Sequence, residues 1–341
     1  MDDTALPRLP GLPAPPPPGA SALPAGTYDG SLVLVTGGGT GLGRAIAAEF
    51  ARLGADLLIV SRSERHLAPA RKELAKLGTR VGSAVCDIRD PRRVREVFDG
   101  SPLPDVLVNN AAANFPVPSE DMSPNAWRAV VDITLTGTFL MTREFGRRHL
   151  AAGTPGSVID VGASYAWTGG PGHAHSAAAK AGVESLVRTL AVEWGPYGIQ
   201  VNGLVPGLMP HEDMTRDIRG NLTRAAADAD GEDRTDGRDG EDGRDGEEHG
   251  DGEDSRDGLR AADDGDARGG AADGLGRRQP ALRVGAPREL GWAATFLASP
   301  YARFVSGHTL VVDGANWQRR DLVAPPVRPV RDQLGRGPFT G

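Results

Sequence analysis

The stretch VTGGGTGLGRA, residues 35–45, decides which fold the sequence predicts. It closes an apolar run of strand length, SLVLVTG at 31–37, and opens a helical pattern, GRAIAAEFARLG at 43–54. Its glycines stand where a tight turn and a close approach of the backbone are needed, and the helix N-terminus offers N–H groups and a positive dipole end to a pyrophosphate. A glycine pattern alone is weak evidence, but between a strand and a helix it predicts a dinucleotide-binding loop. We expect this loop to consist of Gly37, Gly39, Thr40, Gly41, Leu42 and Gly43.

The pattern around this loop alternates between strands and helices. Further apolar runs of strand length occupy 56–62, 81–88, 105–111, 156–162 and 199–207, and further helical patterns occupy 125–150 and 177–195. A last helix at 289–299 and a last strand at 307–315 follow much later in the chain. Such alternation predicts an α/β fold, namely a single Rossmann-type, doubly wound parallel sheet with helices on both faces.

The composition divides the chain of 341 residues into one domain and three less regular parts. We expect a Pro-rich, disordered and solvated arm at 1–27, the Rossmann-type domain at 28–320 and a C-terminal tail at 321–341. An Asp/Gly/Arg-rich insertion interrupts the domain at 224–278, and we expect it to be disordered because it has almost no apolar side chains to bury.

The charge of the chain is unevenly distributed. Residues 228–273 hold 19 acidic and 6 basic residues, which leaves 26 acidic and 32 basic residues elsewhere. The remainder is therefore mildly basic, which suits a phosphorylated small molecule. No clustered Lys/Arg face with interleaved aromatic residues is present, so we expect no nucleic-acid partner.

Several classes of protein are disfavoured by the composition. The single cysteine, Cys86, excludes an intramolecular disulfide and fits a reducing compartment, so we expect a cytoplasmic location. No apolar run of 18 or more residues predicts a membrane span, and the N-terminus does not read as a signal peptide. His173 and His175 have no third ligand at metal spacing, so we expect no metal ion.

The end of the second predicted strand indicates the choice of nucleotide. In the sequence LLIVSRSER an acidic residue would bind a ribose 2′-hydroxyl, but the chain has Ser61 and Arg62 there. This favours the 2′-phosphate of NADP(H) and leaves NAD(H) possible, the alternative being that Arg62 is only a solvent-exposed loop residue. Asp87, in VCDI, is placed to accept a hydrogen bond from the adenine amino group or, alternatively, to cap the strand end.

Four motifs in order, TGGGTGLG, NNAA at 109–112, Lys180 and Pro206–Gly207, resemble those of the short-chain dehydrogenase/reductase family. The resemblance covers roughly 30–222 and 280–315. It implies NAD(P)(H), usually a homotetramer, and cofactor contacts from Asn110, Ala111, Lys180, Pro206 and Gly207. Members of the family typically use a serine, a tyrosine four residues before the lysine, and an asparagine on the fourth helix.

The chain departs from that family pattern at three positions. Ser176 stands in the tyrosine position, Asp132 falls where the helix asparagine is expected, and Ala163 or Ser164 lies near the usual serine. The segments NNAAANF and AVEWGPYGI resemble the 2,4-dienoyl-CoA reductase branch, whose mitochondrial form uses a tyrosine fifteen residues before the lysine. Tyr165 has that spacing, and Asn114 matches the asparagine of the branch. The segment HSAAAKAGV is also similar to peroxisomal enoyl-CoA reductases.

The resemblance implies a function in fatty acid metabolism, the NADPH-dependent reduction of an unsaturated acyl-CoA thioester. Tyr165 and Asn114 would donate hydrogen bonds to the thioester oxygen, Ser176 would donate or hold a water, and Lys180 would bind the nicotinamide ribose. Two alternatives stay open: a carbonyl or alcohol oxidoreductase of the same fold, and a cofactor-binding scaffold that has lost catalysis. In a purely structural interpretation, Tyr165 packs over the cofactor, Ser176 allows close helix packing and Asn114 satisfies a turn.

Overall fold

A computed structural model describes residues 11–211, 214, 275–318 and 329–336 of the chain. The acidic insertion predicted at 224–278 lies outside the described residues except for its last four positions. Residues 1–10 of the arm and much of the C-terminal tail also lie outside them.

The described part of the chain forms one parallel sheet of seven strands, as the alternating pattern predicts. The strands lie in the order β3-β2-β1-β4-β5-β6-β7, so the order reverses between β1 and β4. The strands are β1 (Leu32–Thr36), β2 (Asp56–Ser61), β3 (Val81–Val85), β4 (Val106–Asn109), β5 (Gly156–Val161), β6 (Ile199–Pro206) and β7 (Thr309–Val312). In sheets of this kind ligands bind where the order reverses, at the carboxyl ends of the strands.

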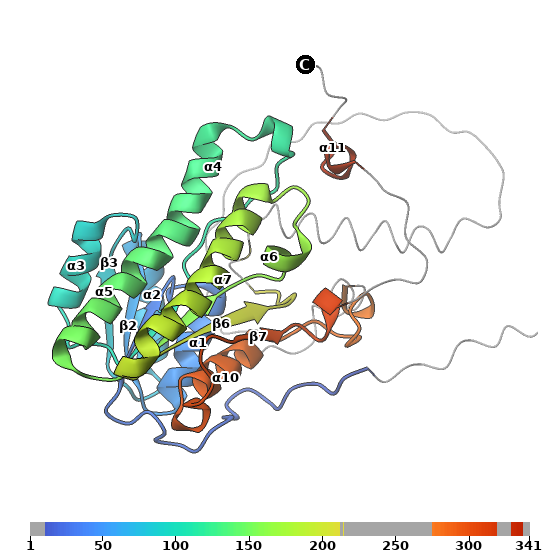
Figure 1. Cartoon of the computed structure of the whole chain (residues 1–341). Coiled ribbons are helices and arrows are strands. Elements are labelled where there is room, and N and C mark those ends of the chain that lie inside the picture. The colour runs from blue at the N-terminus through green and yellow to red at the C-terminus, as the bar shows by residue number, and fades with distance from the viewer. Residues whose placement is uncertain (1–10, 212–213, 215–274, 319–328, 337–341) are drawn as a thin grey trace, which may run out of the picture.

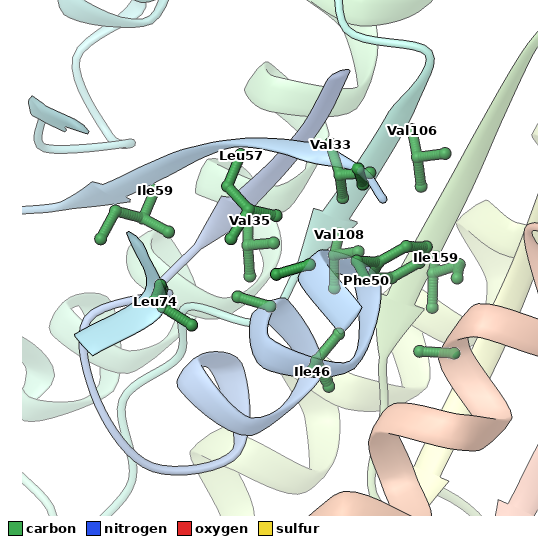
Figure 2. Close-up of a cluster of buried hydrophobic side chains, with 14 of the residues drawn as sticks. Val33, Val35, Ile46, Phe50, Leu57, Ile59, Leu74, Val106, Val108 and Ile159 are labelled. Carbon is green, nitrogen blue, oxygen red and sulfur yellow. The ribbon is translucent and has the colours of Figure 1, made fainter. Parts of the chain in front are cut away.

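Helices cover both faces of the sheet, which confirms the doubly wound architecture (Figure 1). One face is covered by α1 (Gly41–Arg52), α2 (Glu64–Ala75) and α10 (Pro287–Leu297), and the other by α3 (Pro91–Asp99), α5 (Gly137–Ala152) and α7 (Ala174–Trp194). The alternation of side chains along a strand divides the core into two clusters. Figure 2 shows the first cluster, in which Ile46 and Phe50 of α1 lie among valine and isoleucine side chains of the strands.

The helix predicted at 125–150 consists of three parts. α4 (Pro124–Val131) begins at a cap in which the Ser123 hydroxyl accepts from the Ala126 N–H. A π-helical segment, η2 (Asp132–Thr136), then leads into α5 without a break in the helical rod. At its end Gly137 lies so close to Ile88 that a Cβ there would be 2.6 Å from the isoleucine side chain. Close packing against the end of β3 therefore requires glycine at this point.

Short helical elements connect the larger ones. They are η1 (Ser119–Asp121), α6 (Tyr165–Thr168), η3 (Gly195–Tyr197), η4 (Pro300–Ala302), η5 (Asn316–Gln318) and α11 (Val330–Gln333). α6 follows β5 at the carboxyl edge of the sheet, and this position brings its residues close to the point where the strand order reverses.

Residues 11–27 differ from the expected disordered arm. Most of their side chains are exposed, but their backbone is hydrogen-bonded to the domain along α10. Proline has no N–H, so this segment cannot form its own ladder, and its carbonyl groups instead accept from side chains of the domain. The pairs are Arg283 with Pro13, Arg288 with Pro16 and Trp292 with Ala20, and the Leu12 N–H donates to the Ala281 carbonyl.

Candidate active site

The loop between β1 and α1 has the geometry of a phosphate-binding turn. Gly37 has φ +66° and Gly41 has φ +51°, a left-handed conformation that favours glycine. A Cβ on Gly43 would lie 2.4 Å from the Gly37 carbonyl oxygen, so the first turn of α1 packs directly on the loop backbone. The Thr40 side chain does not cap α1, and the positive end of the helix dipole lies at this loop.

A cavity of about 380 Å³ lies beside this loop, at the carboxyl ends of β1, β2 and β4. Its volume is within the range of small-molecule sites. Nine residues of the predicted nucleotide site line it: Gly37, Thr40, Gly41, Leu42, Ser61, Arg62, Asp87, Asn110 and Ala111. A glycine turn and a helix N-terminus beside one cavity are suited to hold the phosphates of a dinucleotide.

Charged residues that follow β2 and β3 line this cavity. Arg62 is exposed, and its charge helps to lower the pKa of Asp87, although the larger cause is a hydrogen bond from Arg89. The Arg89 guanidinium and its backbone N–H both donate to the Asp87 carboxylate. Asp87 is therefore an ionised acceptor at neutral pH, and two guanidinium groups surround it.

Thr36, a residue that the sequence did not single out, connects the ends of β1 and β4 by hydrogen bonds at the place where the strand order reverses. Its hydroxyl oxygen accepts from the N–H groups of Asn110 at 3.0 Å and Ala111 at 3.1 Å. The Asn110 side-chain amide in turn donates to the Thr36 carbonyl oxygen at 3.2 Å. These bonds hold the ends of β1 and β4 together below the cavity. The pairing is invisible in the sequence because 74 positions separate its partners.

Other residues predicted to bind the nucleotide do not line this cavity. Pro206 ends β6 and Gly207 follows it, and the Gly207 N–H donates to the Val312 carbonyl. A Cβ on Gly207 would lie 2.5 Å from the Asp313 Cα atom, so this glycine is required by packing against the end of β7. Gly39 similarly lies against the His66 carbonyl, 2.8 Å from where its Cβ would be. Lys180, on α7, instead lies at the carboxyl end of β5.

Three of the predicted catalytic residues meet at the other end of the site. The Tyr165 hydroxyl, on α6, lies 2.9 Å from the Ser176 hydroxyl oxygen on α7. The Asn114 side-chain amide, from the loop after β4, donates to the Tyr165 oxygen at 3.5 Å. Burial raises the pKa of the Tyr165 phenol, and the hydrogen bond with Ser176 offsets only part of that effect. The phenol is therefore a neutral hydrogen-bond donor.

Lys180 reaches the same region from α7. Its ammonium is buried and donates to the Val161 carbonyl oxygen at 2.5 Å, at the end of β5. Burial lowers the pKa of Lys180, whereas the Asp160 carboxylate raises it. Asp160 was not predicted as a site residue, although an aspartate within the buried strand sequence GSVIDV is an anomaly that could have been noticed.

In the π-helical segment, Asp132 and Thr134 have different surroundings. Asp132, expected at the position of the helix asparagine, has an exposed side chain. Thr134, two residues later, is fully buried, and its hydroxyl oxygen accepts from the Ala113 N–H at 3.2 Å. Thr134 thus fixes the loop that carries Asn114.

The surroundings of the site are aromatic. The His173 ring stacks on Tyr165, with ring centroids 6.2 Å apart, and the buried His175 ring makes an edge contact with Phe115 at 4.7 Å. The Trp317 ring packs against Trp167 of α6 at 5.2 Å. In the described residues, no group of three or more His, Cys, Asp or Glu side chains is arranged to hold a metal ion.

Within the described ranges, no helix combines the length and apolar character needed to cross a bilayer.

Comparisons with known proteins agree with this geometry. The family model described as short chain dehydrogenase matches residues 31–222. A probable 2,4-dienoyl-CoA reductase of Caenorhabditis elegans, named as (3E)-enoyl-CoA-producing, is 33% identical over 85% of this chain and 81% of its own length. A probable 2,4-dienoyl-CoA reductase of Bacillus subtilis, named as (2E)-enoyl-CoA-producing, is 32% identical over 84% of this chain and 96% of its own length.

Solved structures with the same architecture include two with bound NADP. A putative 2-deoxy-d-gluconate 3-dehydrogenase from Agrobacterium tumefaciens superposes with a TM-score of 0.66 at 28% identity, over 86% of this chain and 99% of that chain. A putative gluconate 5-dehydrogenase from Beutenbergia cavernae has a TM-score of 0.66 at 30% identity, with the same coverage of both chains.

Proposed function

The chain belongs to the short-chain dehydrogenase/reductase family and is an NAD(P)-dependent oxidoreductase, and from this premise we propose that it reduces the 2,4-dienoyl thioester of coenzyme A with NADPH. The observation that carries the proposal is the contact between Tyr165, Ser176 and Asn114. The tyrosine that donates at the site comes from α6, and a serine occupies the position four residues before Lys180.

The hydrogen-bonding pattern leaves the phenol proton available to substrate. The Tyr165 oxygen accepts from the Asn114 amide, and it can also accept from the Ser176 hydroxyl. When Asn114 and Ser176 both donate to the phenol oxygen, the phenol O–H points away from them and can donate to an oxygen of a bound substrate. Ser176 and Asn114 thus orient the phenol.

The protonation behaviour of Tyr165 favours a thioester over a ketone. Reduction of a ketone leaves an alkoxide that must receive a proton, which suits a phenol acidified by a nearby ammonium. Here burial raises the pKa of Tyr165, and Lys180 is bound to the Val161 carbonyl instead. A phenol that keeps its proton is better suited to stabilise an enolate oxygen by a hydrogen bond.

In the proposed reaction the residues of this chain hold the cofactor and stabilise the charge that develops on the substrate. A reduced nicotinamide, when bound, supplies the hydride that a dienoyl thioester accepts at a carbon remote from its carbonyl. Negative charge would then collect on the thioester oxygen, where Tyr165 would donate a hydrogen bond, and a proton from water would add to a carbon of the enolate to complete the reduction. Lys180 lies at the edge of the sheet, where it can hold the nicotinamide ribose, and the loop at Gly37–Gly43 would hold the pyrophosphate.

The preference for NADPH is supported by the end of β2. Ser61 and Arg62 follow that strand, and both line the cavity. No carboxylate is present there to bind a ribose 2′-hydroxyl, whereas the exposed Arg62 guanidinium can bind a 2′-phosphate. We expect NADH to serve as the weaker alternative.

The proposal is tested by following NADPH and NADH oxidation in parallel with a 2,4-dienoyl-CoA, a 2-enoyl-CoA and a simple ketone. Highest kcat/KM for the dienoyl thioester with NADPH supports it. Turnover of the ketone alone would establish a carbonyl reductase, and cofactor binding without any turnover would establish a scaffold. NMR of the product shows whether the remaining double bond is at carbon 2 or carbon 3, which distinguishes the two products named for the relatives.

The expected homotetramer is part of the same proposal. Large apolar side chains are exposed on α7 and on the connection after α10, among them Val192, Tyr301 and Phe304. Burial of such side chains against other copies of the chain would remove them from water. Light scattering at several protein concentrations gives the oligomeric state directly.

A further inference from the structure

A cluster of buried polar side chains lies directly beneath the candidate catalytic lysine. Asn109 on β4, Thr142 on α5, Asp160 on β5 and Lys180 on α7 are each at most 6% exposed. Along β5 the side chains of Val158 and Asp160 share one face, because Ile159 and Val161 belong to the core cluster on the other face. Asp160 therefore points to the side of the sheet that α5 and α7 cover.

The hydrogen bonds of Asp160 are incomplete. Its Oδ1 atom accepts from the Asn109 side-chain amide at 2.8 Å, and the same amide donates to the Thr142 hydroxyl at 2.7 Å. Its Oδ2 atom is buried and has no hydrogen-bond partner among the described residues. A carboxylate can accept several hydrogen bonds, so this one depends on a nearby positive charge for stabilisation when it is ionised.

Lys180 is that charge. Its ammonium donates to the carbonyl oxygen of Val161, the residue that follows Asp160. Burial, the largest effect, lowers the pKa of Lys180, and Asp160 is the charged group that raises it. Burial likewise raises the pKa of Asp160, while Asn109 and Lys180 lower it. The two groups are therefore linked in protonation.

Other ionisable groups on the neighbouring elements have partners elsewhere. Tyr165 on α6 bonds Ser176, and His175 on α7 packs on Phe115. The remaining groups are ion-paired or hydrogen-bonded away from Lys180: Glu184 with Arg188 and Thr309, Glu144 with Arg147 and Arg148, and His149 with Thr154 and Pro104. None of these groups contributes to the pKa shift of Lys180.

We propose that Asp160 is a positioning residue for the reaction, whose carboxylate keeps the buried Lys180 ammonium charged and directed at the edge of the sheet. The inference rests on the proposed function only where Lys180 is taken to bind the nicotinamide ribose. Without the Asp160 charge, the burial of Lys180 would favour its neutral form, which donates fewer hydrogen bonds and carries no charge toward the cofactor.

The lysine content of the chain allows a direct test. Only three lysines are present, Lys72, Lys76 and Lys180, and the first two are exposed, one on α2 and one at its C-cap. In protein labelled with ¹³C at the lysine ε-carbon, NMR would show three signals, and Lys180→Arg identifies the third. We expect the Lys180 signal to titrate below the ordinary lysine pKa in the wild type, because burial disfavours its charged form. In Asp160→Asn it should titrate lower still, by on the order of one pH unit.

Control variants separate charge from packing. Thr142→Val removes the hydroxyl beside Asn109 but no charge, so the Lys180 midpoint should stay near that of the wild type. Asp160→Ser is a second neutral variant in case Asp160→Asn does not fold, and it should lower the midpoint in the same direction. An unchanged midpoint in a folded neutral variant would overturn the proposal, as would an equal change in Thr142→Val.

Cofactor binding provides the functional readout. As the pH is raised, the Kd for NADPH should begin to increase at a lower pH in Asp160→Asn than in the wild type. In Lys180→Arg this increase of Kd with pH should be absent, because arginine stays charged. The NMR measurement requires neither cofactor nor substrate. If the NMR shift is found while no acyl-CoA is reduced, the role of Asp160 stands and the proposed function fails.

Discussion

The two ends of the site are built in different ways. At the nucleotide end the backbone forms the site, through the left-handed conformations of Gly37 and Gly41 and the close packing of Gly43. At the catalytic end side chains form it, through Tyr165, Ser176 and their neighbours on separate elements. The first kind of site depends on the absence of side chains and the second on which side chains are present. Substitutions at the two ends should therefore affect different measured quantities.

The largest expected effect belongs to the catalytic end. Tyr165→Phe keeps the ring that packs on His173 and removes only the hydroxyl. Turnover of a dienoyl-CoA should fall by on the order of 10²–10³, mainly in kcat, because the lost hydrogen bond matters most in the transition state. The Kd for NADPH should stay unchanged.

Ser176→Ala is the matched variant, because it removes a hydroxyl that touches Tyr165 and leaves the phenol in place. It should lower kcat less than Tyr165→Phe. Full activity of Tyr165→Phe together with loss of activity in Ser176→Ala would assign the donor role to Ser176.

Substitutions at the nucleotide end, where the backbone forms the site, should instead lower the affinity for the cofactor. Gly43→Ala places a Cβ within 2.4 Å of the Gly37 carbonyl oxygen, so the loop must move away from the first turn of α1. We expect NADPH affinity to fall by on the order of 100-fold, measured by titration calorimetry. Gly195→Ala is the control, because no atom lies within 4 Å of its added Cβ, and its NADPH affinity should match the wild type. Equal losses in both variants would point to general unfolding.

This difference also explains what the sequence could predict. The Gly-rich loop and the strands were found because glycines and apolar runs of strand length report the backbone conformation locally. The contact of Tyr165 with Ser176 was reached only through the spacing of a resembling branch. Thr36, Thr134 and Asp160 were missed, since their partners lie on other elements and no spacing rule links them. The binding of residues 11–27 along α10 was missed for the same reason.

A smaller effect separates the two cofactors within the nucleotide end. Arg62→Ala should weaken NADPH binding by about 10–100-fold, the value of one to two charge-assisted hydrogen bonds, and leave NADH binding nearly unchanged. Arg65→Ala is the control, because Arg65 lies on the same turn but donates to His66. Equal weakening of both nucleotides by Arg62→Ala would remove the basis for the NADPH preference.

The smallest effect concerns folding stability at the catalytic end. The folded-state pKa of Asp160 is raised, so its contribution to stability is fully present below its unfolded pKa of about 3.9 and is lost as the pH rises through the folded value. Any stability advantage of the wild type over Asp160→Asn should therefore shrink between pH 4 and pH 8, by on the order of 1 kcal/mol or more.

Urea unfolding of both proteins at several pH values measures this difference. Lys72→Ala serves as the reference, because Lys72 is exposed on α2 and is not among the groups that shift the pKa of Asp160, so its stability difference from the wild type should vary little with pH. A constant difference between the wild type and Asp160→Asn would show that Asp160 has the same pKa in the folded and unfolded states.

The π turn between α4 and α5 gives the helix one residue more than a regular coil of that length would hold. Single π turns of this kind occur frequently at functional sites. Deleting one residue from 132–136 would remove the wide turn, restore regular α-helical hydrogen bonds and shift the side chains of this segment relative to α5. Thr134 would then leave Ala113, and the loop with Asn114 would lose its anchor. The irregular turn of this helix therefore positions the loop that carries Asn114, and a change of one residue in the length of the turn would misplace that loop.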